Sequence, residues 1–150
     1  MVYRRLYKEM QIDFFDTETG MDNRAVKGGV YQIDLINVET NKSVCLYIGE
    51  SVWIASRCGM HLYSLFEEPE YLGLKKDDID NDKLTLKFSV ISEINEKKSI
   101  LGVGKYKEQE LEAIIENRPL TQLQTSDRQI RNIDEKVEIV QREMKCNGLK

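Results

Sequence analysis

Five side chains in this sequence combine groups that can move protons with groups that can bind anions. Two of them are tyrosines in short strings, Gly29-Val30-Tyr31 and Tyr47-Ile48-Gly49. Arg57 and His61 follow four residues apart, and Glu110 lies further along the chain. A guanidinium binds an oxyanion through two directed hydrogen bonds, and an imidazole exchanges a proton near neutral pH. A tyrosine in a strand is more often a core residue when it stands alone, so the combination carries the functional interpretation.

The elements that must position these residues follow from the hydrophobic pattern. We expect strands over residues 30–38 and 44–48, joined as a hairpin by residues 39–43. Ser51 is a plausible cap for a helix that ends near residue 66. On that helix Arg57 and His61 share one face, because residues four apart lie one above the other. Its core stripe is expected to be Ile54, Cys58, Leu62 and Leu65. The cation and the imidazole would therefore border the core near the ends of both strands.

Together these motifs resemble the GIY-YIG nuclease family. The resemblance covers roughly residues 28–122, and four separated segments match in order: Gly29-Val30-Tyr31, the string that begins at Leu46 (Leu-Tyr-Ile-Gly-Glu-Ser), the Arg57/His61 pair, and Glu110 ahead of Arg118-Pro119. Two positions depart from the family pattern. Val30 replaces the isoleucine of the first motif, and Gln122 occupies the place where the family often has an asparagine.

The resemblance implies a role for each residue in phosphodiester hydrolysis. The family uses one divalent cation on a single glutamate, so Glu110 would hold Mg²⁺, with Mn²⁺ as a substitute. Arg57 would pair with the scissile phosphate. Tyr31 would act as the general base or its relay, and Tyr47 as a second contact to phosphate or water. Because a phenol with a pKa of about 10 is a poor base at neutral pH, His61 is expected to take its proton.

Length and composition limit the class of protein. A chain of 150 residues is expected to form one domain over residues 1–150, with the motif core at about 28–122. The net charge of −4 excludes a nucleic-acid binder that works by bulk positive charge. Three scattered cysteines and one histidine argue against a zinc site and favour a reducing cytoplasm. No signal peptide and no membrane-length apolar run is recognised, so we expect a cytoplasmic protein with no membrane partner and no organic cofactor.

The remaining segments complete an α+β domain, a small mixed three-stranded sheet flanked by helices. We expect a short N-terminal helix over residues 3–10, a loop over 17–29, an acidic surface excursion over 67–82 and a third strand over 83–92. Helices follow at about 105–117 and 126–145. The last helix carries an apolar stripe at Ile130, Ile133, Val137, Val140 and Met144.

Two other patterns are set aside. The series Asp78-x-Asp80-x-Asp82 resembles the start of a calcium loop, but Lys83 stands at the glycine position, so a solvated acidic loop is expected. Gly102-Val-Gly104 is a fragment of a phosphate-loop pattern that lacks its third glycine, and a turn explains it.

The expected function is that of a Mg²⁺-dependent DNA endonuclease. Since the chain leaves little room for a separate DNA-binding domain, it looks most like the small restriction endonucleases of the family. Cutting both strands with one site per subunit would need a second subunit, and the apolar stripe of the last helix is a candidate homodimer interface. The alternatives are a phage, repair or structure-specific nuclease with the same chemistry, and a catalytically silent nucleic-acid-binding module with the same fold.

Overall fold

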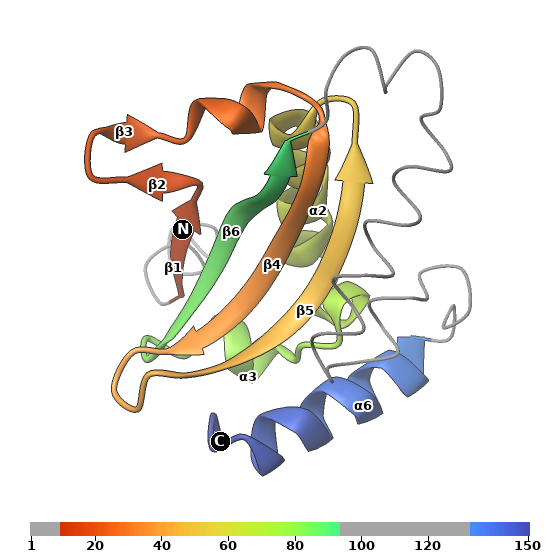
Figure 1. Ribbon diagram of the computed structural model, residues 1–150. Helices are drawn as coiled ribbons and strands as arrows, with labels where there is room; N and C mark the ends of the chain where they lie inside the picture. The colour runs from red at the N-terminus through yellow and green to blue at the C-terminus, as the bar shows by residue number, and fades with distance from the viewer. Residues whose placement is uncertain (1–9, 94–132) are drawn as a thin grey trace.

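A mixed four-stranded sheet forms the centre of the protein (Figure 1). The computed structural model describes residues 10–93 and 133–150. Its strand order is β1-β6-β4-β5, with bounds β1 Gln11–Phe14, β4 Gly29–Asn37, β5 Lys42–Ser51 and β6 Leu84–Glu93. β1 runs parallel to β6, whereas β4 runs antiparallel to both β5 and β6. The α+β class and the mixed sheet are confirmed.

The expected sheet of three strands is wrong, because β1 adds a fourth. β1 has only two apolar residues, Ile12 and Phe14, and its partner β6 lies far along the chain. Local periodicity cannot show such a long-range parallel pairing, which depends on contacts between distant segments. The other three strands lie close to where they are expected. β4 and β6 are each displaced by one residue, and β5 extends two residues further at its start and three at its end.

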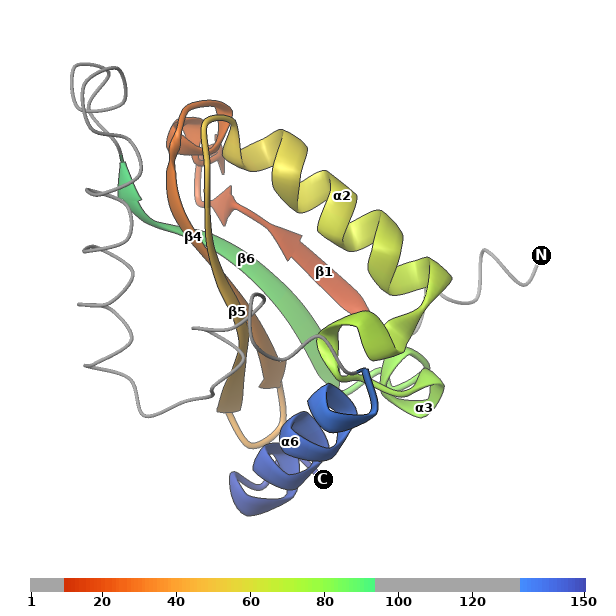
Figure 2. The same cartoon turned by 90° about the vertical axis from the view of Figure 1, so that its right-hand side faces the viewer.

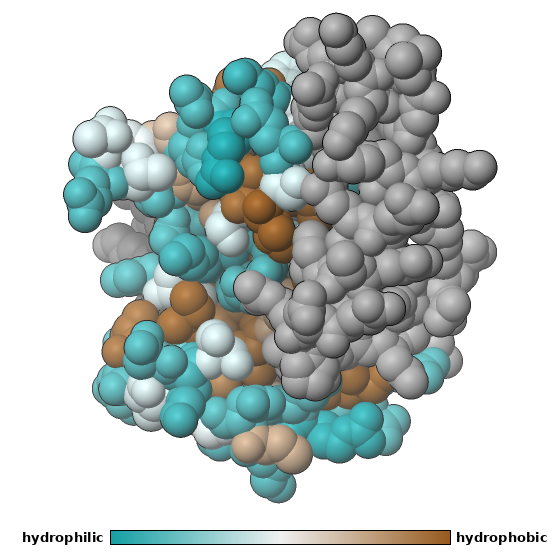
Figure 3. Space-filling model, viewed as in Figure 1, coloured by the Kyte–Doolittle hydropathy of each residue, from teal (hydrophilic) through white to brown (hydrophobic). Residues whose placement is uncertain are grey.

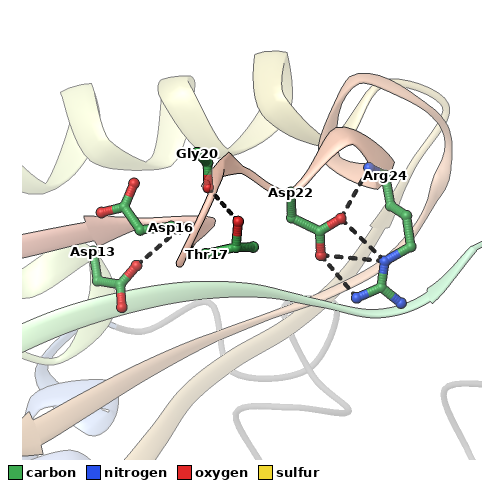
Figure 4. A network of polar contacts seen from close by, with 6 residues as sticks. All are labelled: Asp13, Asp16, Thr17, Gly20, Asp22 and Arg24. Carbon is green, nitrogen blue, oxygen red and sulfur yellow. Dashed lines mark hydrogen bonds and ion pairs between the residues drawn. The ribbon is translucent and has the colours of Figure 1, made fainter.

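The segment between β1 and β4, which was expected to be a loop, contains regular secondary structure. It contains a two-stranded ribbon, β2 Asp16–Thr17 and β3 Gly20–Met21, followed by the 3₁₀ helix η1 Asn23–Val26. Figure 4 shows its polar contacts: Thr17 Oγ1 donates to the carbonyl of Gly20 at 2.6 Å, and Arg24 pairs with Asp22 at 2.8 Å. The hydrogen bond from the Arg24 side chain lowers the pKa of Asp22. This segment therefore leads into β4 as a defined turn.

Helix α2, Ile54–Glu67, lies along one face of the sheet (Figure 2). It begins after Trp53, and the side chain of Ser51, the expected cap, instead accepts from the Trp53 amide at 3.0 Å. Its buried residues are Ile54, Cys58, His61 and Leu65. Leu62 is only partly buried, so His61 takes the place in the buried stripe that the sequence assigned to Leu62. The imidazole therefore faces the sheet.

The opposite face of the sheet carries a second, smaller apolar cluster. Val30, Cys45 and Ile48 are buried there, with Ile91 packed against them. Figure 3 views the molecule from this side, where brown apolar surface alternates with teal hydrophilic surface among the described residues. Because Tyr31 belongs to the larger cluster, the first tyrosine and α2 lie on the same side of the sheet.

The segment over residues 67–82 is not a surface excursion. It forms the 3₁₀ helix η2 Pro69–Leu72 and the short helix α3 Lys76–Ile79, and it buries Leu72, Leu74 and Ile79. The side chain of Asp78 is only 1% exposed. Its burial is compensated, since the carboxylate accepts from the Lys75 amide at 2.8 Å and pairs with Lys150 at 2.6 Å. The acidic composition of this segment predicted a position at the surface, but Asp78 is buried because a lysine distant in the sequence neutralises its charge.

Helix α6, Ile133–Cys146, packs against η2. Val140 and Met144 of the expected stripe are buried, Val137 is partly buried, and Ile133 is 37% exposed. The predicted helices at 3–10 and 105–117, the start of the last helix and Gly102-Val-Gly104 lie largely or wholly outside the described residues. Within the described part of the chain, no helix is long and apolar enough to cross a bilayer.

Candidate functional site

The β4–β5 hairpin places the two motif tyrosines side by side. Tyr31 lies opposite Gly49, and Tyr47 lies opposite Ile33 on the same face. The two phenol rings stack with centroids 6.0 Å apart and planes inclined by 22°. A Cβ on Gly49 would lie 2.5 Å from both Tyr31 Oη and Tyr47 Cε1, much closer than atoms can approach. The second motif therefore ends in glycine because the rings occupy the space that a side chain would fill.

The glycine of the first motif also makes room, here for the neighbouring strand. A Cβ on Gly29 would collide with the carbonyl oxygen of Ser92 in β6. The pairing of β4 with β6 shifts register between Val30 and Tyr31, which is the irregularity that accompanies this close approach. The amide of Ile54 donates to the carbonyl of Lys27 at 3.0 Å, so the start of α2 is fixed beside the same point.

His61 lies among three tyrosine rings. Its Nε2 is 2.7 Å from Tyr31 Oη, and its ring centroid is 4.6 Å from that of Tyr47. The side chain is 2% exposed and Tyr31 is 0% exposed. The imidazole therefore lies at hydrogen-bond distance from the phenol whose proton it is expected to take.

The third ring belongs to Tyr71 of η2, which sequence reasoning missed. Tyr71 Oη lies 2.9 Å from His61 Nδ1, so both ring nitrogens of the histidine face a phenol. The only signal in the sequence was an apolar run, Tyr71-Leu72-Gly73-Leu74, inside the acidic segment. Such a run predicts a return of the chain to the core, and Leu72 and Leu74 are indeed buried.

The electrostatics of the site centre on the Tyr31 oxygen. Burial, and then the neighbouring Tyr47, raise the pKa of Tyr31 far above its usual value. The charge and hydrogen-bonding capacity of Arg57 oppose this rise. Partial burial alone would lower the pKa of Arg57, but Tyr31 reverses that effect and raises it. Arg57 therefore remains a cation, and its charge favours the deprotonated form of Tyr31.

A second buried group near Arg57 is inert. Burial raises the pKa of the Cys58 thiol well above its ordinary value, in spite of the charge of Arg57 beside it. Since the thiolate is the nucleophilic form of cysteine, Cys58 is a packing residue of α2. The chemistry available at this point is proton transfer and anion binding by the phenols, the imidazole and the guanidinium.

Four of the five expected site residues are thus brought together: Tyr31, Tyr47, Arg57 and His61. Glu110, the expected metal ligand, and Gln122 lie outside the described residues. Residues 10–93 and 133–150 contain no group of three or more His, Cys, Asp or Glu side chains placed to hold a metal ion. Comparisons with protein-family models, with curated proteins and with solved structures found no match for this chain.

Proposed function

We propose that this protein is a divalent-metal-dependent DNA endonuclease that hydrolyses phosphodiester bonds with a GIY-YIG-type site. The observation that carries the proposal is the distance of 2.7 Å between Tyr31 Oη and His61 Nε2. The charge of Arg57 in addition lowers the pKa of Tyr31 against the effect of burial. A phenol becomes a useful base only if one neighbour accepts its proton and another stabilises the phenolate. These two neighbours supply both functions.

The proposed steps use the residues of this chain. Tyr31 passes its proton to His61 Nε2, and the phenolate takes a proton from the attacking water. The guanidinium of Arg57 stabilises the phenolate and pairs with a phosphate oxygen through its planar fork. Tyr47, stacked on Tyr31, would make a second contact to the phosphate or the water. A divalent cation held by Glu110 would supply Lewis acidity at the leaving oxygen.

A plasmid-nicking assay tests the proposal. Cleavage is expected with Mg²⁺ or Mn²⁺, and none with EDTA or with Tyr31→Phe. Tyr63→Phe is the matched control, because Tyr63 is on the same helix as His61 but is 69% exposed. Defined ends on the product would support a restriction-type enzyme over a repair or structure-specific nuclease. Absence of cleavage under all metal conditions would overturn the proposal.

A second candidate function is a catalytically silent nucleic-acid-binding module. The observation that favours it is the 0% exposure of Tyr31, because a general base must reach water. Such a module would shift DNA in a gel with the same affinity in Mg²⁺ and in EDTA and would leave the plasmid intact. The nicking assay therefore separates the two candidates directly.

We further propose that cutting of duplex DNA uses a homodimer. In the described part of α6, Val140 and Met144 are already buried against their own chain, which leaves the partly exposed Ile133 for a second subunit. Light scattering of the protein, free and bound to DNA that it cuts, would test the dimer. A monomer in both states would remove it without affecting the chemistry of the site.

A further inference from the structure

We propose that Tyr71 is a positioning residue that holds His61 in the tautomer with its proton on Nδ1, so that Nε2 is unprotonated and can accept the proton of Tyr31. The observation is that the histidine has a phenol on each ring nitrogen, Tyr31 at 2.7 Å from Nε2 and Tyr71 at 2.9 Å from Nδ1. A neutral imidazole donates through one nitrogen and accepts through the other. One phenol must therefore donate to His61 and the other must accept from it.

The direction follows from what else surrounds the Tyr31 oxygen. The charge of Arg57 lowers the pKa of Tyr31 against the effect of burial, and a guanidinium offers no acceptor for the phenol proton. Tyr31 is fully buried, and a buried hydroxyl whose proton has no acceptor is costly. His61 Nε2 is the acceptor at hydrogen-bond distance. Nδ1 then carries the proton and donates it to Tyr71 Oη.

The surroundings of Tyr71 fix its ring for this task. The Lys136 ammonium of α6 lies 5.7 Å from the centroid of the Tyr71 ring, a distance at which a cation attracts an aromatic face. Two residues later, a Cβ on Gly73 would collide with Val140 of α6, and Gln141 donates to the Gly73 carbonyl at 3.1 Å. The contacts with α6 therefore hold η2 in place and keep Tyr71 next to His61.

The catalytic meaning of this inference rests on the proposed function, but the tautomer itself does not. His61 is the single histidine of the chain, so every imidazole signal in a ¹⁵N-labelled sample belongs to it. Long-range ¹H–¹⁵N spectra at pH 8 distinguish a protonated from an unprotonated ring nitrogen. We expect Nδ1 protonated and Nε2 bare in the parent protein. In Tyr71→Phe, which keeps the ring under Lys136, we expect the proton to move toward Nε2.

Tyr63→Phe is the matched control and should leave both nitrogen signals unchanged. A parent spectrum with the proton on Nε2, or a Tyr71→Phe spectrum identical to that of the parent, would overturn the inference. These spectra need no DNA and no metal, so they stand whether or not the protein cuts. If the protein does not cut DNA, the spectra can therefore still confirm or contradict the tautomer.

If the protein cuts, Tyr71→Phe should slow single-turnover cleavage roughly 10-fold, the equivalent of one hydrogen bond. The same change should have no further effect in a His61→Ala background, since Tyr71 acts through the histidine. Equal slowing by Tyr71→Phe with and without His61 would contradict the positioning role. Thermal melts of each variant check that the loss comes from the site and not from unfolding.

Discussion

Gly49→Ala should disable the site while leaving the fold in place. Gly49 has no role in chemistry, yet a Cβ there would lie 2.5 Å from Tyr31 Oη, 2.5 Å from Tyr47 Cε1 and 2.6 Å from Tyr31 Cζ. Ordinary contacts begin near 3.4 Å. The alanine methyl group therefore has to push both phenol rings aside.

The size of the effect follows from these distances. To reach normal contact with the new methyl group, each ring must move by about 1 Å. Tyr31 Oη starts 2.7 Å from His61 Nε2, so such a movement breaks or badly bends this hydrogen bond. A misplacement of about 1 Å costs roughly 100-fold in rate. Overpacking of the core should cost about 1 to 3 kcal/mol of stability.

Single-turnover cleavage and a thermal melt measure the two effects. Gly59→Ala is the matched control: Gly59 is on α2, where a Cβ would have nothing within 4 Å, and alanine in a helix should stabilise by about 0.5 to 1 kcal/mol. The NMR signals of His61 should change in Gly49→Ala and stay the same in Gly59→Ala. A Gly49→Ala protein that cuts at the parental rate would refute the reasoning that ring placement at Tyr31 matters.

Four further predictions concern single side chains. Tyr31→Phe keeps the ring and removes the proposed general base, so single-turnover cleavage should fall ~10²–10⁴-fold with little change in Tm. A rate within a few-fold of the parent would contradict the base assignment. His61→Ala should slow cleavage less than Tyr31→Phe does, and its rate should recover as pH rises from 6 to 9. Burial raises the pKa of Tyr31, so each pH unit in this range increases the phenolate fraction about tenfold. A loss of rate that is independent of pH would contradict the role of His61 as proton acceptor. Glu110→Ala should abolish nicking, while a gel shift should still detect DNA binding. Normal cutting by this variant would mean that another carboxylate is the metal ligand. Burial raises the pKa of Glu143 to about 7, above its ordinary 4.5, so its ionisation costs stability increasingly as pH rises through that interval. Glu143→Gln should therefore be neutral near pH 4 and, with allowance for solvent screening, stabilising by about 1–2 kcal/mol at pH 8 in urea unfolding; a difference independent of pH would contradict this.

The part of the site that the sequence could predict is the part built from neighbouring segments. Tyr31 and Tyr47 lie on two strands of one hairpin, and the helix with Arg57 and His61 follows directly, so alternation and the four-residue spacing suffice to place them. The register of α2 was the weak point. The pattern favoured Leu62 as the buried residue, whereas hydrogen bonds with two phenols offset the cost of burying His61 instead.

What could not be predicted depends on contacts between distant segments. Tyr71 reaches His61 because α6 holds η2 in place, and the burial of Asp78 depends on Gln141 and Lys150. Gln141 and Lys150 are more than 60 positions away from Gly73 and Asp78 in the sequence, so these contacts leave no periodic pattern. The acidic segment over residues 67–82 therefore resembles a solvated loop in the sequence, although Lys150 neutralises the Asp78 carboxylate.

The parallel pairing of β1 with β6 has a consequence for the newly made chain. β1 is synthesised about 70 residues before its partner strand. At ~5–20 residues per second, β1 waits roughly 4 to 14 seconds before β6 exists. During this interval Ile12 and Phe14 lack the sheet that will cover them. Chaperones that bind short apolar segments would therefore have several seconds in which β1 is made but its partner strand is not.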